Sequence, residues 1–383
     1  MNLSMLSLNR FVFFVLCIYL TFGQLEIFIV YKITNVIQVT LLFLILIYLI
    51  FIGKDITGRF SYIVLLIIPV LILLSLAAGV NIFGDISRIG FFLLFIVIPL
   101  FVSNCRLNFD ILLSYVVNFY ILISLLIALD FLVYVFFGRV LLFSVIVYIT
   151  PRFSGPFNDP NFMGFIFALL FLLVYFDKKE VSFVSRKMIL FLFAFCIVLS
   201  GSATAILLSS FSLVQARIFK VRYTFIKPVI CIFISFVFVP VFMEFKDDIH
   251  SVFSVIVSDV FELEQDLIDV KFNSLLFRYE SVYAAVGFIM ENPFGYGYLT
   301  LLDYLPRDTH NSYIGISFEY GIVMLLVITL SLFSINKQKS VDSMTTFTCL
   351  SALFLNIHYM PIYFFVVIIC LSKNNLRNGE VIK

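Results

Sequence analysis

Long apolar segments follow one another through almost the whole chain and constrain its fold more than any other feature. Several reach the roughly 20 residues that a helix needs to cross a bilayer. The chain is 63% hydrophobic and 13% charged, whereas soluble domains carry about 25% charged residues. We therefore expect an all-α, polytopic integral membrane protein. The expected membrane helices cover residues 11–31, 37–52, 60–79, 89–103, 111–137, 161–176, 188–201, 203–215, 228–242 and 312–333, and a last apolar block covers 344–371.

Basic residues predict the orientation of these helices. If successive helices alternate in direction, most Lys and Arg outside the apolar segments fall on one side, which is then the cytoplasmic side. The basic C-terminal tail joins that side only if the last block turns back near Pro361. This hairpin gives about twelve spans, and a single long helix would give about eleven. No cleavable signal sequence is expected, because no small-residue cleavage site follows the first basic residue.

Three parts of the chain follow from this topology: a membrane-helix bundle at 1–243, a large outer loop at 244–311, and C-terminal membrane helices with a short cytoplasmic tail at 312–383. The loop holds twelve Asp and Glu against four Lys and Arg. Its first half is predicted to be an amphipathic helix with a solvated face. Asn273 or Ser274 is expected to begin a second helix that runs to about Met290, with Ser281, Val282 and Ala285 on one face. The N-P-F-G-Y-G turn then follows.

Few polar segments interrupt the apolar sequence, and the first is R-F-S-G-P-F-N-D-P-N at 152–161. Its prolines and glycine force an irregular backbone at the membrane edge, where peptide groups need partners. Such a turn can aim Arg152, Asn158, Asp159 and Asn161 into a cavity. The alternative is a structural role, in which Asp159 and Asn161 begin the next helix.

Arg278 and His310 stand out in and after the outer loop. A guanidinium binds phosphate oxygens in a forked geometry, although Arg278 could instead pair with Glu280. His310, next to Asn311 at the start of an expected span, is a natural proton carrier near neutral pH. A single histidine at an interface can equally have a structural role.

Acidic residues inside apolar segments are costly unless they are partnered, so Glu319 and Asp130 are also candidates. The sequence shows no partner for Asp130. Arg88 is a weaker candidate on the same outer face. Six scattered cysteines and three histidines form no metal-ligating pattern, and neither a metal nor a cofactor is expected.

In this order, the motifs resemble the O-antigen polymerase and O-antigen ligase superfamily. Residues 152–161 are similar to its R-x-x-G-x-x-x-[ND]-P-N element. Arg278 with residues 292–297 resembles its loop arginine and N-P-x-G-x-G turn, and His310 with Gly321 resembles its H-N-x9-G motif. Two positions depart from the family pattern. Met324 stands where Gly, Thr or Tyr is typical, and S-G-S-A-T-A at 200–205 lacks the usual arginine.

The resemblance implies a GT-C-like membrane enzyme of the bacterial inner membrane that transfers glycan from undecaprenyl diphosphate at the periplasmic face, with inversion and without a metal. Its expected partners are the lipid-linked donor and acceptor glycans, the lipid bilayer and a chain-length regulator protein, and not nucleic acid. Arg278 and Arg152, with Arg88 in reserve, would stabilise the diphosphate leaving group. His310 would accept the proton of the incoming sugar hydroxyl, oriented by Asn311 or Glu319.

Other functions remain open. An O-antigen ligase uses the same donor but delivers the finished glycan to the lipid A core, and the Pro-Asn element and the imperfect ligase motif favour a polymerase. A flippase for the same lipid typically shows repeated halves and helices broken at the midplane, and no repeat is visible. A metal-dependent multi-span glycosyltransferase would need a carboxylate pair in the first outer loop, where only Glu26 lies.

Overall fold

The structure is a computed structural model, and it describes the chain from residue 3 to residue 355 with gaps. The described segments are 3–31, 33–52, 109–147, 151–157, 159–176, 184–218, 226–261, 265–296, 301–306, 308–322 and 339–355, together with isolated positions. Five sequence predictions fall outside them: the helix at 60–79, the turn near Pro361 in the last apolar block, and the positions of Arg88, Asn158 and Met324. Most of the helix expected at 89–103 also lies outside.

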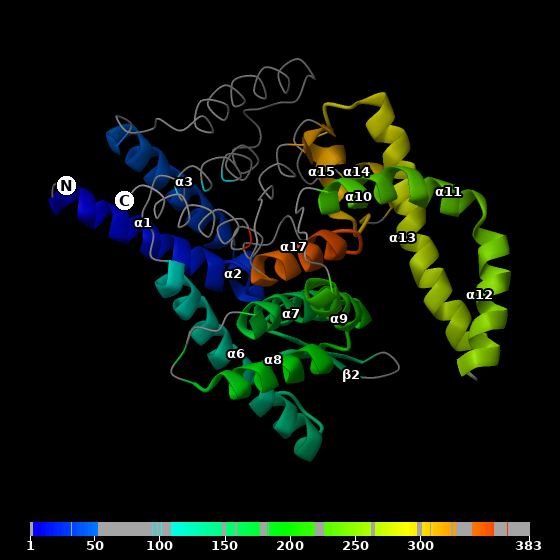
Figure 1. Cartoon of the computed structure of the whole chain (residues 1–383), viewed down its shortest axis with the longest axis horizontal. Coiled ribbons are helices and arrows are strands. Elements are labelled where there is room, and N and C mark those ends of the chain that lie inside the picture. The colour runs from blue at the N-terminus through cyan, green and yellow to red at the C-terminus, as the bar shows by residue number, and fades with distance from the viewer. Residues whose placement is uncertain are drawn as a thin grey trace.

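The described part of the chain is mostly helical, as predicted (Figure 1). Its helices are α1 (Leu3–Phe22), α2 (Glu26–Val30), α3 (Ile33–Ile52), α6 (Phe109–Phe137), α7 (Pro160–Phe176), α8 (Arg186–Ser200), α9 (Ala203–Ile218), α10 (Ile226–Phe233), the π-helical η2 (Ile234–Phe238), α11 (Val239–Glu244), α12 (Lys246–Phe261), α13 (Gln265–Glu291), α14 (Leu301–Tyr304), α15 (Ser312–Tyr320) and α17 (Lys339–Ser351). A short antiparallel hairpin of β1 (Ser144–Val147) and β2 (Pro151–Gly155) departs from the all-α prediction.

Two helical stretches of the described chain are long and apolar enough to cross a membrane, Ile111–Phe137 and Lys227–Glu244. Shorter apolar helices include Pro160–Phe176 and Ala203–Ile218. The number of spans and the division into three parts therefore stay predictions.

Some predicted helix bounds are wrong. The helix expected at 11–31 breaks between α1 and α2, where Thr34 Oγ1 donates to the carbonyl of Gly23 at 2.8 Å. The helix expected at 312–333 is interrupted after Tyr320, because Gly321 takes φ +88° and the N–H of Ile322 donates to the carbonyl of Pro293. The described residues Ile322, Leu325 and Leu326 are again helical. The second loop helix, α13, begins at Gln265, well before the predicted capping residues.

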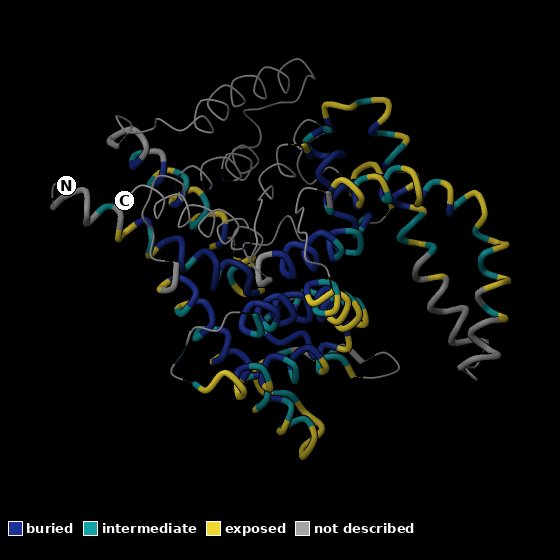
Figure 2. Tube along the Cα trace, in the orientation of Figure 1, coloured by how far each residue is buried: buried dark blue, intermediate teal, exposed yellow. Residues whose placement is uncertain are grey.

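α7 forms the centre of the described fold. It packs against α8, α9, α17 and β2, and it is dark along most of its length in Figure 2, which marks buried residues. A helix that is apolar on every side is stable only when other elements surround it. Phe165 near its start stacks on Phe347 of α17, with ring centroids 5.3 Å apart. This contact brings the beginning of α7 close to the end of α17.

The predicted outer loop forms an extended arm. α12 and α13 run side by side to the right of Figure 1, and much of the arm is exposed in Figure 2. The second half of α13 packs on α11 and α15. Ser281, Val282 and Ala285 are all buried there, which confirms their predicted common face. The arm thereby fixes Arg278 beside the beginning of α15.

Candidate functional site

Arg152 lies on β2 with its guanidinium at the C-terminal end of α8. Its Nε donates to the carbonyl of Ser200 at 3.0 Å, and its Nη2 donates to Asn161 Oδ1 at 2.9 Å. The last carbonyls of a helix lack partners within the helix, and a cation there also interacts favourably with the helix dipole. A Cβ on Gly201 would come within 3.1 Å of Arg152 Cγ. The glycine therefore lets the arginine lie flat across the helix end.

Asp159 precedes α7 and caps it. Its carbonyl accepts from the N–H groups of Phe162 and Met163, and its Oδ1 accepts from the N–H of Asn161 at 2.6 Å. The structural interpretation of this turn therefore holds for Asp159. Asn161 has a second function, because its side-chain oxygen holds the Arg152 guanidinium. Arg152, Asn161 and Asp159 form one connected polar group.

His310 has a left-handed backbone conformation, with φ +49°, the one such non-glycine residue among those described. A side chain in this region costs roughly 1–2 kcal/mol, and strain of this kind concentrates at functional sites. Its N–H donates to Asp308 Oδ1 at 3.3 Å. The conformation turns the chain sharply just before α15 begins.

Asn311 fixes the other side of this turn. Its Oδ1 accepts from the N–H groups of Tyr313 and Ile314 at 3.0 and 3.2 Å, which makes it the N-cap of α15. The cap stabilises a helix typically by about 1 kcal/mol. Its Nδ2 donates to Ser235 Oγ of η2 at 3.1 Å. Nothing in the sequence singles out Ser235, because a single serine in an apolar helix is common.

Three charged groups from separate elements act on the His310 imidazole. Burial lowers the pKa of His310, and Arg278 lowers it further, while Asp308 and Asp159 raise it. Burial is the largest of these causes, so the net shift of the pKa is downward. The imidazole is therefore mainly neutral at neutral pH and free to accept a proton.

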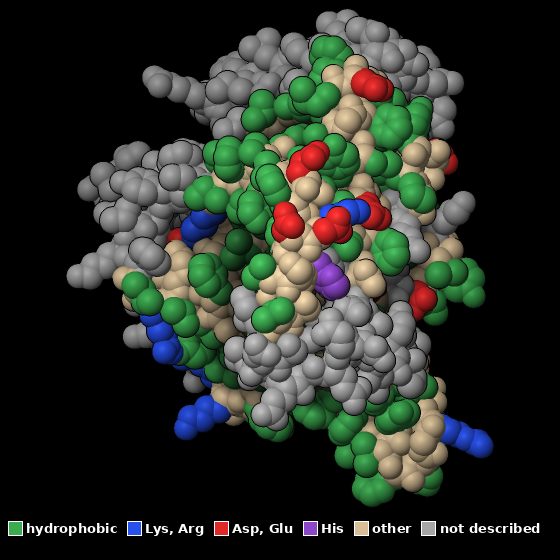
Figure 3. All heavy atoms as spheres, turned by 90° about the vertical axis from the view of Figure 1, so that its right-hand side faces the viewer, with side chains coloured by type: hydrophobic (Ala, Val, Ile, Leu, Met, Phe, Trp, Pro, Cys, Tyr) green, Lys and Arg blue, Asp and Glu red, His purple; other side chains and the backbone are tan. Residues whose placement is uncertain are grey.

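The structure thus brings together residues that are about 150 positions apart in the chain. Asp159 before α7 and Arg278 on α13 both lie close enough to His310 to change its pKa. Arg152 joins the group through Asn161. Figure 3 shows the side of the molecule where α12 and α13 lie, and there acidic, basic and histidine side chains lie within a mainly hydrophobic surface. Among the described residues, no group of His, Cys, Asp and Glu is arranged to hold a metal ion.

Glu319 lies at the other end of α15 from His310. From Ser312, where α15 begins, the helix rises about 10 Å to Glu319, and Glu319 is 4% exposed. The predicted N-P-F-G-Y-G turn packs here, since a Cβ on Gly295 would come within 2.6 Å of the Glu319 carbonyl oxygen. Glu319 is therefore part of the junction between α13 and α15, and the carboxylates near His310 are Asp159 and Asp308.

Asp130 has the partners that the sequence could not name. Its Oδ1 accepts from the N–H groups of Leu141 and Leu142 at 2.6 and 3.0 Å, and its Oδ2 accepts from that of Phe143 at 3.0 Å. The carboxylate is fully buried and holds the turn that leads from α6 to β1. Its position indicates a structural role.

Comparison with known proteins gives one match. Residues 188–329 match the family model described as O-antigen ligase. Over these residues the chain is similar to the O-antigen ligase family. This confirms the resemblance to the O-antigen ligase and polymerase superfamily that the motifs predicted. No curated protein and no solved structure matches the chain.

Proteins of the O-antigen ligase family are membrane proteins and glycosyltransferase-like enzymes of lipopolysaccharide assembly. The matched segment includes Arg278 and His310, whereas Arg152 and Asp159 precede it. In this chain the Arg152 guanidinium lies at Ser200, inside the segment that lacks the arginine typical of the family. A cation is thus present at this place, contributed by β2.

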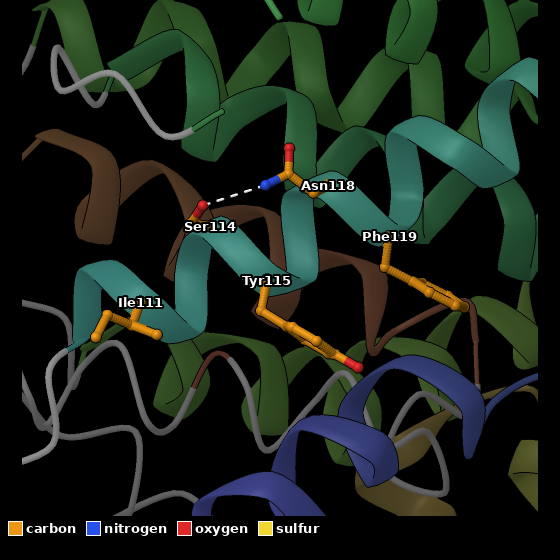
Figure 4. Close-up of a pocket in the computed structure, with 5 residues that line it drawn as sticks. All are labelled: Ile111, Ser114, Tyr115, Asn118 and Phe119. Atoms are coloured by element: carbon orange, nitrogen blue, oxygen red, sulfur yellow. Dashed lines mark hydrogen bonds between the residues drawn. The ribbon is translucent and has the colours of Figure 1, made fainter. Parts of the chain in front are cut away.

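A pocket of about 570 Å³ lies elsewhere, along α6 (Figure 4). Its lining residues are Ile111, Ser114, Tyr115, Asn118 and Phe119. Asn118 Nδ2 donates to Ser114 Oγ at 3.2 Å within it. The pocket contains none of the charged residues that surround His310.

Proposed function

We propose that this protein is a glycosyltransferase that polymerises undecaprenyl-diphosphate-linked glycan repeat units at the periplasmic face of the bacterial inner membrane. The observation that carries the proposal is that Arg278 and Asp159, from distant parts of the chain, both act electrostatically on the half-buried His310. The family match supports lipid-linked glycans as substrates. The proposed mechanism is inverting and needs no metal, because guanidinium groups supply the positive charge.

In the proposed reaction, a sugar hydroxyl of the acceptor attacks the anomeric carbon of the donor. The new bond between this oxygen and the anomeric carbon forms as the bond from that carbon to the phosphate oxygen breaks. The undecaprenyl diphosphate leaves with the electron pair, and the hydroxyl proton passes to His310. One displacement of this kind inverts the anomeric configuration.

The charges around His310 suit both stages of this transfer. Before reaction, burial and Arg278 favour the neutral imidazole that accepts a proton. As the proton arrives, Asp159 and Asp308 stabilise the imidazolium. Arg278 is placed to stabilise the diphosphate as its negative charge develops, which is the larger requirement with such a leaving group. Arg152, linked through Asn161, would extend the cation site.

The proposed enzyme has about twelve membrane spans, with residues 1–243 and 312–383 in the membrane and 244–311 on the periplasmic side. The two long apolar helices support this topology. A chain-length regulator protein is a proposed partner of the assembled polymerase. Labelling of single cysteines placed in α12 by an impermeant thiol reagent on intact spheroplasts tests the periplasmic position of the arm.

The second candidate function is O-antigen ligase, which the description of the matching family favours. Lipopolysaccharide gels of a deletion strain separate the two functions. Loss of a polymerase leaves lipid A core that carries one repeat, whereas loss of a ligase leaves the bare core. We expect the first pattern.

Complementation of the same strain tests the residues. We expect His310→Ala and Arg278→Ala each to reduce polymer at least about 100-fold, since general-base and charge-stabilising groups commonly contribute that much. His250→Ala on α12 and Arg217→Ala on α9 are the matched controls and should leave polymer length unchanged. Protein level in the membrane is measured for every variant. Wild-type polymer from either site variant would remove that residue from the mechanism.

A further inference from the structure

We infer that Ser235, in the π-helical turn η2, is a positioning residue that holds the His310 loop in its reactive conformation through the Asn311 side chain. This role rests on the proposed function and adds a supporting residue to the same site. Ser235 is fully buried within the apolar stretch Lys227–Glu244. Among the described residues its side-chain hydrogen bonds are with Cys231 and Asn311, so its proposed effect on His310 passes through Asn311.

Both polar atoms of the Asn311 side chain lie within hydrogen-bond distance of Ser235. Oδ1 accepts from the N–H groups of Tyr313 and Ile314 and lies 3.4 Å from Ser235 Oγ. Nδ2 donates to Ser235 Oγ at 3.1 Å, and Ser235 Oγ donates to the carbonyl of Cys231 at 3.0 Å. Asn311 is 2% exposed, so water does not substitute readily for the hydroxyl.

The π-helical turn explains why this serine faces α15. Pro240 in α11 has no N–H to donate, and its ring crowds the carbonyl four residues earlier. The helix adjusts by forming the wider η2 turn just before it. Such turns are rare and frequent at functional sites. The sequence therefore uses Pro240 to create the irregular turn that carries Ser235.

His310 needs such support because its backbone is strained. Its φ of +49° is unfavourable for a residue with a side chain. On one side, Asp308 Oδ1 accepts its N–H. On the other, Asn311 is held by its cap and by Ser235. If the contact with Ser235 is lost, the loop can relax and the imidazole can leave its half-buried position among Arg278, Asp159 and Asp308.

The test uses the full-length protein in nanodiscs with four variants. Ser235→Ala removes the hydroxyl, and Ser235→Thr keeps it. Asn311→Ser keeps a good N-cap but is too short to reach η2, so it breaks the same contact from the other side. Ser212→Ala is the matched control, since Ser212 is also fully buried and donates to the carbonyl four residues earlier, Leu208, at 2.7 Å.

Two measurements are made on each variant. Kinetics of glycan transfer from the lipid-linked donor give kcat and KM. The rate at which diethylpyrocarbonate modifies His310, followed by mass spectrometry against pH, gives the pKa of the imidazole without any turnover. We expect Ser235→Ala and Asn311→Ser to lower kcat about tenfold, the factor that corresponds to one hydrogen bond, with KM within about twofold. We expect the pKa of His310 to rise toward its ordinary value in both, and Ser212→Ala and Ser235→Thr to match wild type.

An unchanged kcat and an unchanged pKa in folded Ser235→Ala and Asn311→Ser would overturn the inference. A fall in kcat with an unchanged pKa would also overturn it, because the effect would then bypass His310. If the wild type transfers no glycan, the proposed function fails. A raised pKa of His310 in Ser235→Ala would still support the positioning role in that case.

Discussion

Gly295 lies in the turn after α13, the helix that carries Arg278, and this turn packs against the end of α15, the helix that follows His310. Its φ is +93°, and a Cβ there would lie 2.6 Å from the Glu319 carbonyl oxygen and 2.7 Å from the Gly321 nitrogen. Both neighbours are backbone atoms, so no side chain can move aside. We predict that Gly295→Ala forces the turn away from the end of α15 and destabilises the protein.

The structure gives the magnitude of this effect. A methyl-bearing residue at positive φ costs about 1 kcal/mol, and overpacking against fixed atoms costs about 2 kcal/mol more. The turn also holds α15 through the hydrogen bond from the Tyr296 N–H to the Phe318 carbonyl, 2.8 Å long, which would lengthen. A loss of about 3 kcal/mol corresponds to a fall in Tm of roughly 4 °C for a chain of this length.

Buried thiols provide the assay. The free cysteines of the described chain are buried, so a thiol-reactive fluorescent dye labels them only as the protein unfolds; they are Cys17, Cys196, Cys231 and Cys349. Gly287→Ala is the matched control. Gly287 lies inside α13 with nothing within 4 Å of an added Cβ, and alanine there should stabilise the helix by about 0.5–1 kcal/mol. If Gly295→Ala unfolds at or above the Tm of Gly287→Ala, the reasoning about this turn is refuted.

Three further predictions concern charged groups. Because the pKa of His310 is lowered, kcat/KM should stay constant as the pH falls to below 6.5 and should then decrease as the imidazole is protonated. Asp308→Asn removes a negative charge that raises this pKa, so the decrease in kcat/KM should move to still lower pH. Asp130→Asn should lower stability by about 2 kcal/mol without changing transfer per folded molecule, because one amide oxygen replaces a carboxylate that accepts three N–H groups. Lys227→Met should lower the free energy of unfolding by about 3–5 kcal/mol, because buried Asp342 loses the Lys227 ammonium group that lies 2.5 Å away. The double variant with Asp342→Leu should recover most of that stability.

Each of these predictions can be contradicted by a single measurement. Asp303→Asn on exposed α14 is the control for the pH profile and should not move it. A profile that falls at the same pH in Asp308→Asn as in wild type would contradict the assigned electrostatics. Slower transfer at an unchanged Tm in Asp130→Asn would make that residue functional. A double variant as unstable as Lys227→Met would show that the ion pair itself supplies the stability.

Much of the helical fold could be predicted from the sequence, since hydrophobic length and periodicity are local properties. α6, α7, α8 and α9 begin and end within a few residues of their predicted bounds. The residues of the site also stood out, because an apolar chain tolerates few polar segments. His310, Arg278 and the turn at 152–161 were selected on that ground. The buried face of α13 followed from helical spacing.

The exceptions are positions where another part of the chain decides the local structure. α15 ends at Tyr320 because Gly321 meets the turn at Pro293. Asp130 is partnered by backbone N–H groups about a dozen residues later, which no side-chain pattern reveals. The β1–β2 hairpin lies in a segment that was predicted to be irregular.

A helical, strongly apolar chain with a few polar turns that resemble one enzyme superfamily could be read from the amino-acid order alone. The contacts between distant residues could not: Arg152 at the end of α8, Asp159 and Arg278 with His310, and Ser235 with Asn311. The physical reason is the range of the interactions. Helix formation depends on residues three or four apart, whereas these contacts join elements far apart in the chain whose pairing depends on how the helices pack.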